Sequence, residues 1–189
     1  MTDMIEFLQS KYTLVEKNER LFKLQTNRDE LIDIIHFITT NTNFITLSQI
    51  ACTDWIEERI FAVNYLLTTD QRDKNLMVEV LIDRENPVLQ SLLSLFPQAE
   101  VMERDLHEMF GIAFPGNETL YDFALEGWND IPPMRREFDT LAYVNEHYDF
   151  RGGRDDNKDV KAEMKRRRAE AKKLKEAQAK KEGGEEDGN

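Results

Sequence analysis

The stretch ERIFAVNYLLTTDQRDKNLMVEVLID, residues 58–83, holds two runs of alternating apolar side chains separated by the polar residues 70–75. In the second run Leu76, Val78 and Val80 fall on the same face of an extended chain, because successive side chains of a strand point to opposite faces. A connection this short joins antiparallel strands, since parallel strands need a crossover of about a dozen residues or more. The stretch therefore predicts two paired strands with one buried face.

Three segments before this pair extend the expected fold. NFITLSQIACTDW (43–55) is a further β-rich run. Residues 27–41 carry apolar side chains at helical spacing, and Asn27 stands in the N-cap position of that helix. The looser apolar spacing of residues 4–24 favours a short helix followed by an extended segment.

Prolines mark the segment that follows the strands. Asn86 precedes Pro87, and Pro97 stands at the far end of an apolar run, so the pattern predicts a helix over 86–97. Together these elements indicate an α+β fold, an antiparallel β-meander packed with helices, followed by an extended C-terminal arm and a charged tail.

The chain divides into three expected regions. Residues 1–114 form an α+β globular domain, residues 115–150 an extended docking arm, and residues 151–189 a charged tail that is partly helical or disordered. The docking arm keeps presenting aromatic residues without helical or strand periodicity, and so long a loop inside a compact protein is uncommon unless it is functional or disordered. We expect this docking arm to lie along a protein surface.

Charge is distributed unevenly along the chain. The formal net charge is −12, but residues 151–189 hold 13 Lys or Arg and 10 Asp or Glu, whereas the preceding residues hold 12 and 27. An acidic body disfavours binding to nucleic acid or anionic lipid, which requires clustered basic residues. The tail is therefore the one candidate segment for such binding.

Residue types that carry chemistry are scarce. Cys52 is the only cysteine, which excludes an internal disulfide and a cysteine-built metal site. Motifs for nucleotide binding, zinc peptidases and serine hydrolases are missing, as is any apolar run of the ~20 residues that span a bilayer. We expect no catalytic residue, cofactor or metal on this chain, and a cytoplasmic location with membrane contact only through a partner.

MERDLHEMFGIAFPG (102–116) concentrates charged side chains on a short expected helix. Leu106, Met109 and Phe110 lie three and four positions apart and form one apolar ridge. Gly111 is placed to end the helix in a left-handed conformation.

The charges of this helix admit two interpretations. Arg104 could pair with Glu108 at i+4, but an exposed pair contributes only about 0.3–0.5 kcal/mol. The helix is either an ordinary exposed, capped helix or a docking element in which Arg–carboxylate pairs fix the register with a partner. We favour docking, because the small energy of an exposed pair does not account for so many charges.

The residues ERDLHEMFGI (103–112) resemble the hallmark of the 30 kDa (C-type) subunit of respiratory complex I, NADH–quinone oxidoreductase, and of its homologue in membrane-bound, energy-converting NiFe hydrogenases. Residues 83–87 and 133–138 are also similar to that family, and the similarity covers roughly residues 30–145. Residues 116–118 depart from the complex I pattern, and residues 125–128 look more like the hydrogenase branch.

The resemblance implies a non-catalytic scaffold subunit in the soluble arm of a membrane-bound oxidoreductase. Such a subunit would clamp the large catalytic subunit, which is 49 kDa-like or a NiFe hydrogenase large subunit, and lie next to the small iron–sulfur subunit. It would support electron transfer coupled to ion translocation. Iron–sulfur clusters, with a NiFe centre or FMN, are expected on other subunits. The residues expected at the subunit interface are Glu103, Arg104, Asp105, Glu108, Met109, Phe110, Phe114, Trp128, Met134, Arg135, Arg136, Phe138, Tyr143 and Tyr148.

The alternative is a stand-alone binding module whose basic tail contacts RNA or an anionic membrane. Salt separates the two hypotheses, because phosphate binding weakens steeply with ionic strength whereas an apolar contact between subunits persists.

Overall fold

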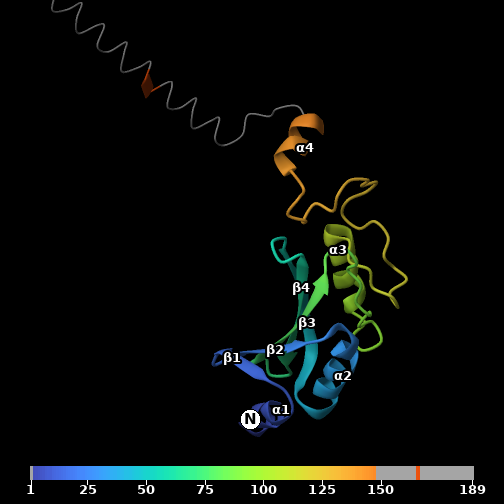
Figure 1. The fold of residues 1–189 in the computed structure, drawn as a ribbon. Coiled ribbons are helices and arrows are strands. Elements are labelled where there is room, and N and C mark those ends of the chain that lie inside the picture. The colour runs from blue at the N-terminus through green and yellow to red at the C-terminus, as the bar shows by residue number, and fades with distance from the viewer. Residues whose placement is uncertain (1, 148–164, 167–189) are drawn as a thin grey trace, which may run out of the picture. The chain divides into compact units, whose positions relative to one another are not determined.

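The computed structural model describes residues 2–147 and 165–166 (Figure 1). The chain forms two compact units, residues 1–140 and 141–189. The elements of the first unit are α1 (Thr2–Lys11), β1 (Leu14–Asn18), β2 (Leu21–Thr26), the 3₁₀ turn η1 (Arg28–Glu30), α2 (Leu31–Asn41), β3 (Phe44–Trp55), β4 (Ile60–Thr69), β5 (Asn75–Asp83) and α3 (Ala99–Phe110). Helix α4 (Thr140–His147) lies almost entirely in the second unit.

The five strands form one sheet in the order β1-β2-β5-β4-β3. β3, β4 and β5 pair antiparallel, so the predicted meander is confirmed. β1 and β2 add a second antiparallel hairpin, and β2 lies parallel to β5, with Leu24 opposite Val78. The parallel pair was not predicted, because the chain passes through α2, β3 and β4 between its two members.

Alternation along the strands sets the buried face as predicted. In β5, Leu76, Val78 and Val80 are fully buried. In α2 the apolar stripe is buried as well, at Leu31, Ile34, Ile35 and Ile38. The Asn27 side chain makes no capping hydrogen bond, and the helix instead begins through the η1 turn.

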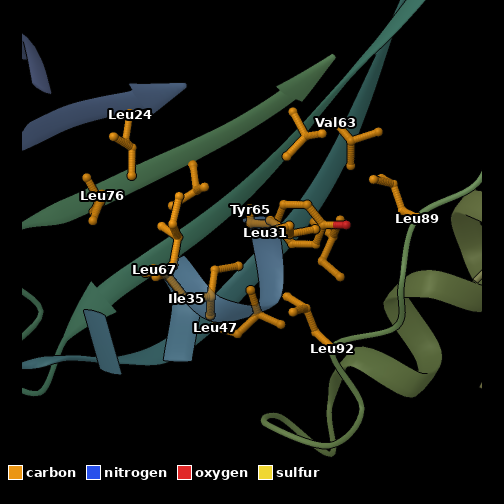
Figure 2. Close-up of a cluster of buried hydrophobic side chains, with 14 of the residues drawn as sticks. Leu24, Leu31, Ile35, Leu47, Val63, Tyr65, Leu67, Leu76, Leu89 and Leu92 are labelled. Carbon is orange, nitrogen blue, oxygen red and sulfur yellow. The ribbon is translucent and has the colours of Figure 1, made fainter. Parts of the chain in front are cut away.

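The core lies between the sheet and α2, and it continues to the segment before α3. In Figure 2, Leu24, Leu67 and Leu76 extend from the strands toward Leu31 and Ile35 of α2. Each fully buried aliphatic side chain of this kind contributes about 1.5–3 kcal/mol relative to an exposed one. The figure also shows Leu89 and Leu92 facing the same cluster from the segment after β5.

The prediction of a helix over residues 86–97 is wrong. The segment is extended at its start: the Leu89 amide donates to the carbonyl of Ala113 at 3.0 Å, and the Ala113 amide donates to the carbonyl of Pro87 at 2.8 Å. A turn follows, closed by the Phe96 amide on the carbonyl of Leu92 at 2.9 Å. Pairing with a neighbouring strand-like segment satisfies these backbone groups, so helical hydrogen bonds are not required.

Helix α3 carries the charged stretch and ends where the sequence predicts. Gly111 adopts φ 75° and ψ 28°, and its amide donates to the carbonyl of His107 at 2.8 Å. Glycine suits this left-handed position because it has no Cβ. The sharp exit turns the chain back along α3 and starts the path of the docking arm.

Candidate functional site

Glu103 lies on the buried side of α3 and is completely inaccessible to solvent. Its carboxylate accepts hydrogen bonds from the Ser91 hydroxyl at 2.7 Å, the Leu92 amide at 2.7 Å and the Asn117 side-chain amide at 3.0 Å. Desolvation raises the pKa of Glu103 above its ordinary value, although these three donors oppose the shift. Glu103 therefore fastens both the segment before α3 and the start of the docking arm to the helix.

Arg104 lies between two aromatic rings of the docking arm. Its guanidinium carbon is 4.6 Å from the centre of the Tyr121 ring and 4.4 Å from that of Phe123. Cation–π contacts at such distances contribute roughly 0.5–1 kcal/mol each at exposed sites. Its Nε atom is buried without a hydrogen-bond partner among the described residues.

Glu108 holds the next part of the docking arm through the backbone. Its carboxylate oxygens accept hydrogen bonds from the amides of Phe123 at 2.9 Å, Ala124 at 2.9 Å and Leu125 at 2.8 Å. Desolvation acts to raise the pKa of Glu108, but the three amides and the charge of Arg104 outweigh it, and the pKa falls below its ordinary value. The pairing of Arg104 with Glu108 that the i+4 spacing allows is therefore limited to an electrostatic effect of Arg104 on the pKa of Glu108, because the Glu108 carboxylate accepts its hydrogen bonds from backbone amides.

The other residues of α3 and of the following residues 111–114 that were expected at the subunit interface differ in their exposure to solvent. Asp105 is exposed, and desolvation together with the charge of Glu108 raises its pKa. Phe110 packs edge-on against Phe61 with ring centres 5.9 Å apart, and Phe114 is almost completely buried. Met109 is half-buried against the core. Phe110 and Phe114 therefore belong to the core of this chain.

A second set of contacts anchors the docking arm near residues 134–137. Arg84 forms a two-point ion pair with buried Asp54, at 2.6 and 2.9 Å, and also pairs with Glu137. Asp54 additionally accepts the Arg136 amide at 2.9 Å, while the Arg135 Nε donates to the carbonyl of Phe110 at 2.7 Å. The ends of β3 and β5 thereby hold this part of the docking arm against the sheet.

Between these anchors, large apolar side chains face solvent. Tyr121 is 62% exposed, Phe123 48%, Ile131 42% and Met134 57%. Of these four residues, only Met134 was expected at the subunit interface from the sequence. Tyr121, Phe123 and Ile131 were missed, although their place in the apolar, aromatic-rich docking arm was the available signal.

The other residues expected at the subunit interface lie between positions 128 and 148 of the docking arm, and those that the structure describes differ in exposure. Trp128 and Phe138 are half-buried and pack edge-on against each other, with ring centres 5.4 Å apart. The Arg136 side chain is exposed, whereas that of Arg135 is largely covered. Tyr143 is half-buried within the second unit. Tyr148 lies outside the described residues.

The described part of the chain lacks features of a metal or thiol site. Among residues 2–147 and 165–166, no group of three His, Cys, Asp or Glu side chains is arranged to hold a metal ion. Burial, with the nearby charge of Asp54, raises the pKa of the Cys52 thiol to about 12, which is opposite to the shift of a reactive cysteine. Within the same residues, the helices are too short or too polar to cross a membrane.

Comparison with known proteins defines the class to which this fold and charged helix belong. A family model described as the 30 kDa subunit of respiratory-chain NADH dehydrogenase matches residues 24–144. The match spans more than half of the chain, so the chain belongs to this family. The resemblance found at residues 103–112 is thereby confirmed.

Individual relatives are similar over most of this region. The C-type subunit of NADH-quinone oxidoreductase from Bartonella bacilliformis is 32% identical over 128 residues, which cover 64% of this chain and 60% of that protein. NADH dehydrogenase (ubiquinone) iron-sulfur protein 3 of Beta trigyna is 31% identical over 142 residues, 71% of each protein. The chain thus spans about three fifths of the length of the bacterial relatives, 61% in Bartonella tribocorum.

A solved structure shares the fold. A chain of the membrane-bound sulfane sulfur reductase, an archaeal respiratory membrane complex, superposes with a TM-score of 0.65 at 27% identity. The superposition covers 78% of this chain and 88% of that one.

Proposed function

We propose that this chain is a non-catalytic assembly subunit in the soluble arm of a membrane-bound oxidoreductase related to complex I. The docking arm is fixed to its own domain by Glu103, Glu108 and the Asp54–Arg84 pair. It nevertheless keeps Tyr121 and Met134 more than half exposed. A rigid segment that presents apolar side chains outward is a binding surface, since monomeric proteins seldom expose such groups together.

The occupant of this surface is the large catalytic subunit, 49 kDa-like or of the NiFe hydrogenase type, with the small iron–sulfur subunit adjacent. Support comes from family membership, from the NADH-quinone oxidoreductase relatives and from the fold shared with a chain of a respiratory membrane complex. The redox groups, iron–sulfur clusters and a NiFe centre or FMN, belong to those other subunits. The chain works on the cytoplasmic side, and it reaches the membrane through the complex.

The proposal is tested by purifying the complex from its host through a tag on this chain and identifying the retained subunits by mass spectrometry. Deleting the docking arm is a poor test, because its residue Asn117 is part of the folded interior and donates to the buried carboxylate of Glu103. The variant I131S/M134S instead removes exposed apolar side chains and leaves the anchors in place. We expect it to reduce the retained large subunit at least ~10-fold, as central apolar contacts of an interface do.

The matched control is V15S/I45S, which removes side chains of similar exposure, 48% and 51%, from β1 and β3. It should retain the large subunit as the wild type does. Wild-type chain that brings down no large subunit would contradict the proposal. Equal losses in the two variants would show that the docking arm is not the contact surface.

A further inference from the structure

A small cavity lies between α3 and the docking arm, within the first unit of the chain. Its volume is about 220 Å³, and its walls include Leu120, Trp128 and Pro132. Cavities that hold small molecules or cofactors usually measure ~300–1,000 Å³. This cavity is therefore too small for a cofactor, and its size suits one inserted side chain.

Carboxylates give the cavity a negative charge. Its lining includes Asp122 and Asp130, together with Glu108 and the imidazole of His107 from α3. The Glu108 carboxylate is already engaged by three backbone amides, and Nδ1 of His107 contacts the carbonyl of Ile112 at 2.8 Å. One oxygen of Asp122 accepts the Gly127 amide at 3.1 Å, and one oxygen of Asp130 accepts the Ile131 amide at 2.6 Å. Backbone amides thus hold both carboxylates in position, and neither forms an ion pair with any of residues 2–147.

Neighbouring cations of the chain are committed to other contacts. The guanidinium of Arg104 lies between Tyr121 and Phe123, and that of Arg135 is directed to the carbonyl of Phe110 and the ring of Phe61. Asp122 and Asp130 are exposed, so the negative charge of the cavity is accessible and complementary to a cation supplied from outside the chain.

We propose that this cavity receives one Lys or Arg side chain of the large catalytic subunit. Such side chains pack a long aliphatic stem on apolar surface while the charged end stays at a polar position. Here the stem packs on Leu120 and Pro132, the charge lies near Asp122 and Asp130, and the indole of Trp128 adds a cation–π surface. The inference rests on the proposed function, for which it supplies an electrostatic contact beside the apolar one.

The test uses the same tagged complex and compares two pairs of substitutions with equal charge change. D122N/D130N neutralises the cavity and keeps the side-chain oxygens that accept the backbone amides. E118Q/E126Q neutralises two exposed acids of the docking arm that are not part of the cavity lining. The retained large subunit is quantified after washing at roughly 0.1 and 0.5 M NaCl. Exposed charges are screened more strongly at the higher of these two concentrations.

We expect D122N/D130N to lower the retained large subunit about 10-fold at the lower salt concentration, since removing one partner of a desolvated charge pair accelerates dissociation. E118Q/E126Q should change it less than about 2-fold, because charges at the rim of an interface contribute little to affinity. Equal retention by D122N/D130N and wild type, or equal losses in both double variants, would overturn the inference.

Failure of the inference is distinguishable from failure of the proposed function. If wild-type chain retains no large subunit, the proposed function fails; if it does retain it and D122N/D130N does so equally, only the cavity assignment fails. Thermal unfolding of each variant monitors the fold. If the double variant unfolds, the single variants D122N and D130N take its place, each with an expected loss of about 3-fold and the same refuting outcome of no loss.

Discussion

The substitution Glu103→Gln probes the buried carboxylate on which the docking arm depends. The carboxylate faces three donors, from Ser91, Leu92 and Asn117. A glutamine offers one acceptor oxygen and one NH₂ group in the same space. The NH₂ group must then face a donor, because the Asn117 oxygen already accepts the amide and hydroxyl of Thr119 at 3.0 and 2.7 Å and cannot be turned toward it.

The expected loss in the free energy of unfolding follows from this count of donors and acceptors. The Ser91 hydroxyl can rotate and accept a hydrogen bond. In one orientation of the glutamine the Leu92 amide loses its acceptor, and in the other the NH₂ group of Asn117 loses one of its two acceptors and keeps only the carbonyl of Glu100. A buried donor without a partner costs about 1–3 kcal/mol. The free energy of unfolding should fall by that amount, which corresponds to a decrease in Tm of roughly 2–4 °C per kcal/mol for a chain of this size.

Urea denaturation followed by circular dichroism measures this loss, and its pH dependence provides a second check. Burial raises the pKa of folded Glu103 above the value of the unfolded chain, so the folded state holds the proton more strongly. Wild-type stability therefore decreases as pH rises from the ordinary carboxyl value through the raised one. Subtracting the free energy of unfolding of E103Q from that of the wild type at each pH isolates the part of the pH dependence that Glu103 causes.

The control for this experiment is Asp105→Asn, an exposed neighbour on the same helix. It should change the free energy of unfolding by no more than about 0.5 kcal/mol. If E103Q were as stable as the wild type and showed the same pH profile, the hydrogen-bond reasoning for the buried carboxylate would be refuted.

Three further predictions concern the anchors of the docking arm. Asp54→Ala leaves the guanidinium of Arg84 with Glu137 as its remaining partner and removes the acceptor of the Arg136 amide. It should lower the free energy of unfolding by about 1–3 kcal/mol in urea titrations; a loss below about 0.5 kcal/mol would contradict this. Glu108→Gln should lower the protection factors of the amides of residues 123–125 against hydrogen exchange. In the wild-type chain these protection factors, which correct for the intrinsic pH dependence of exchange, should fall as pH drops below 4.5 through the lowered pKa of Glu108. Unchanged protection factors would show that the carboxylate does not hold the backbone. Gly111→Ala forces a Cβ into the left-handed conformation, 3.1 Å from a guanidinium nitrogen, and should lower Tm by an amount equivalent to about 1–2 kcal/mol; an unaltered Tm would count against this.

Local pattern was sufficient to predict the central elements of the fold. The alternation of Leu76, Val78 and Val80 corresponds to the buried face of β5, and the apolar stripe of residues 31–38 is the buried face of α2. These elements bury one face each, so their sequence period reflects their structure. The segment over 86–97 has residues buried on more than one side and pairs with another segment, and helix punctuation alone could not reveal that pairing.

The candidate site was predictable in location but not in internal geometry. The sequence pointed to α3 and the docking arm, yet its pattern assigned the α3 carboxylates one common role, that of contacting a partner. Glu103 is buried inside the chain, whereas Glu108 binds three backbone amides of the docking arm. A buried glutamate is costly unless several donors surround it, and those donors come from Ser91 and Asn117, whose proximity only the tertiary structure shows.

The Asp54–Arg84 pair joins the ends of two strands across 30 positions of the chain, and Asp54 accepts the amide of Arg136 across 82 positions. We expect closure of the docking arm to follow the local contacts in folding, because bringing distant parts of a chain together costs loop-closure entropy. An incompletely folded chain would lack the surface that we propose as the contact with the large subunit. Assembly of the complex would in this way select finished subunits and leave misfolded ones unincorporated.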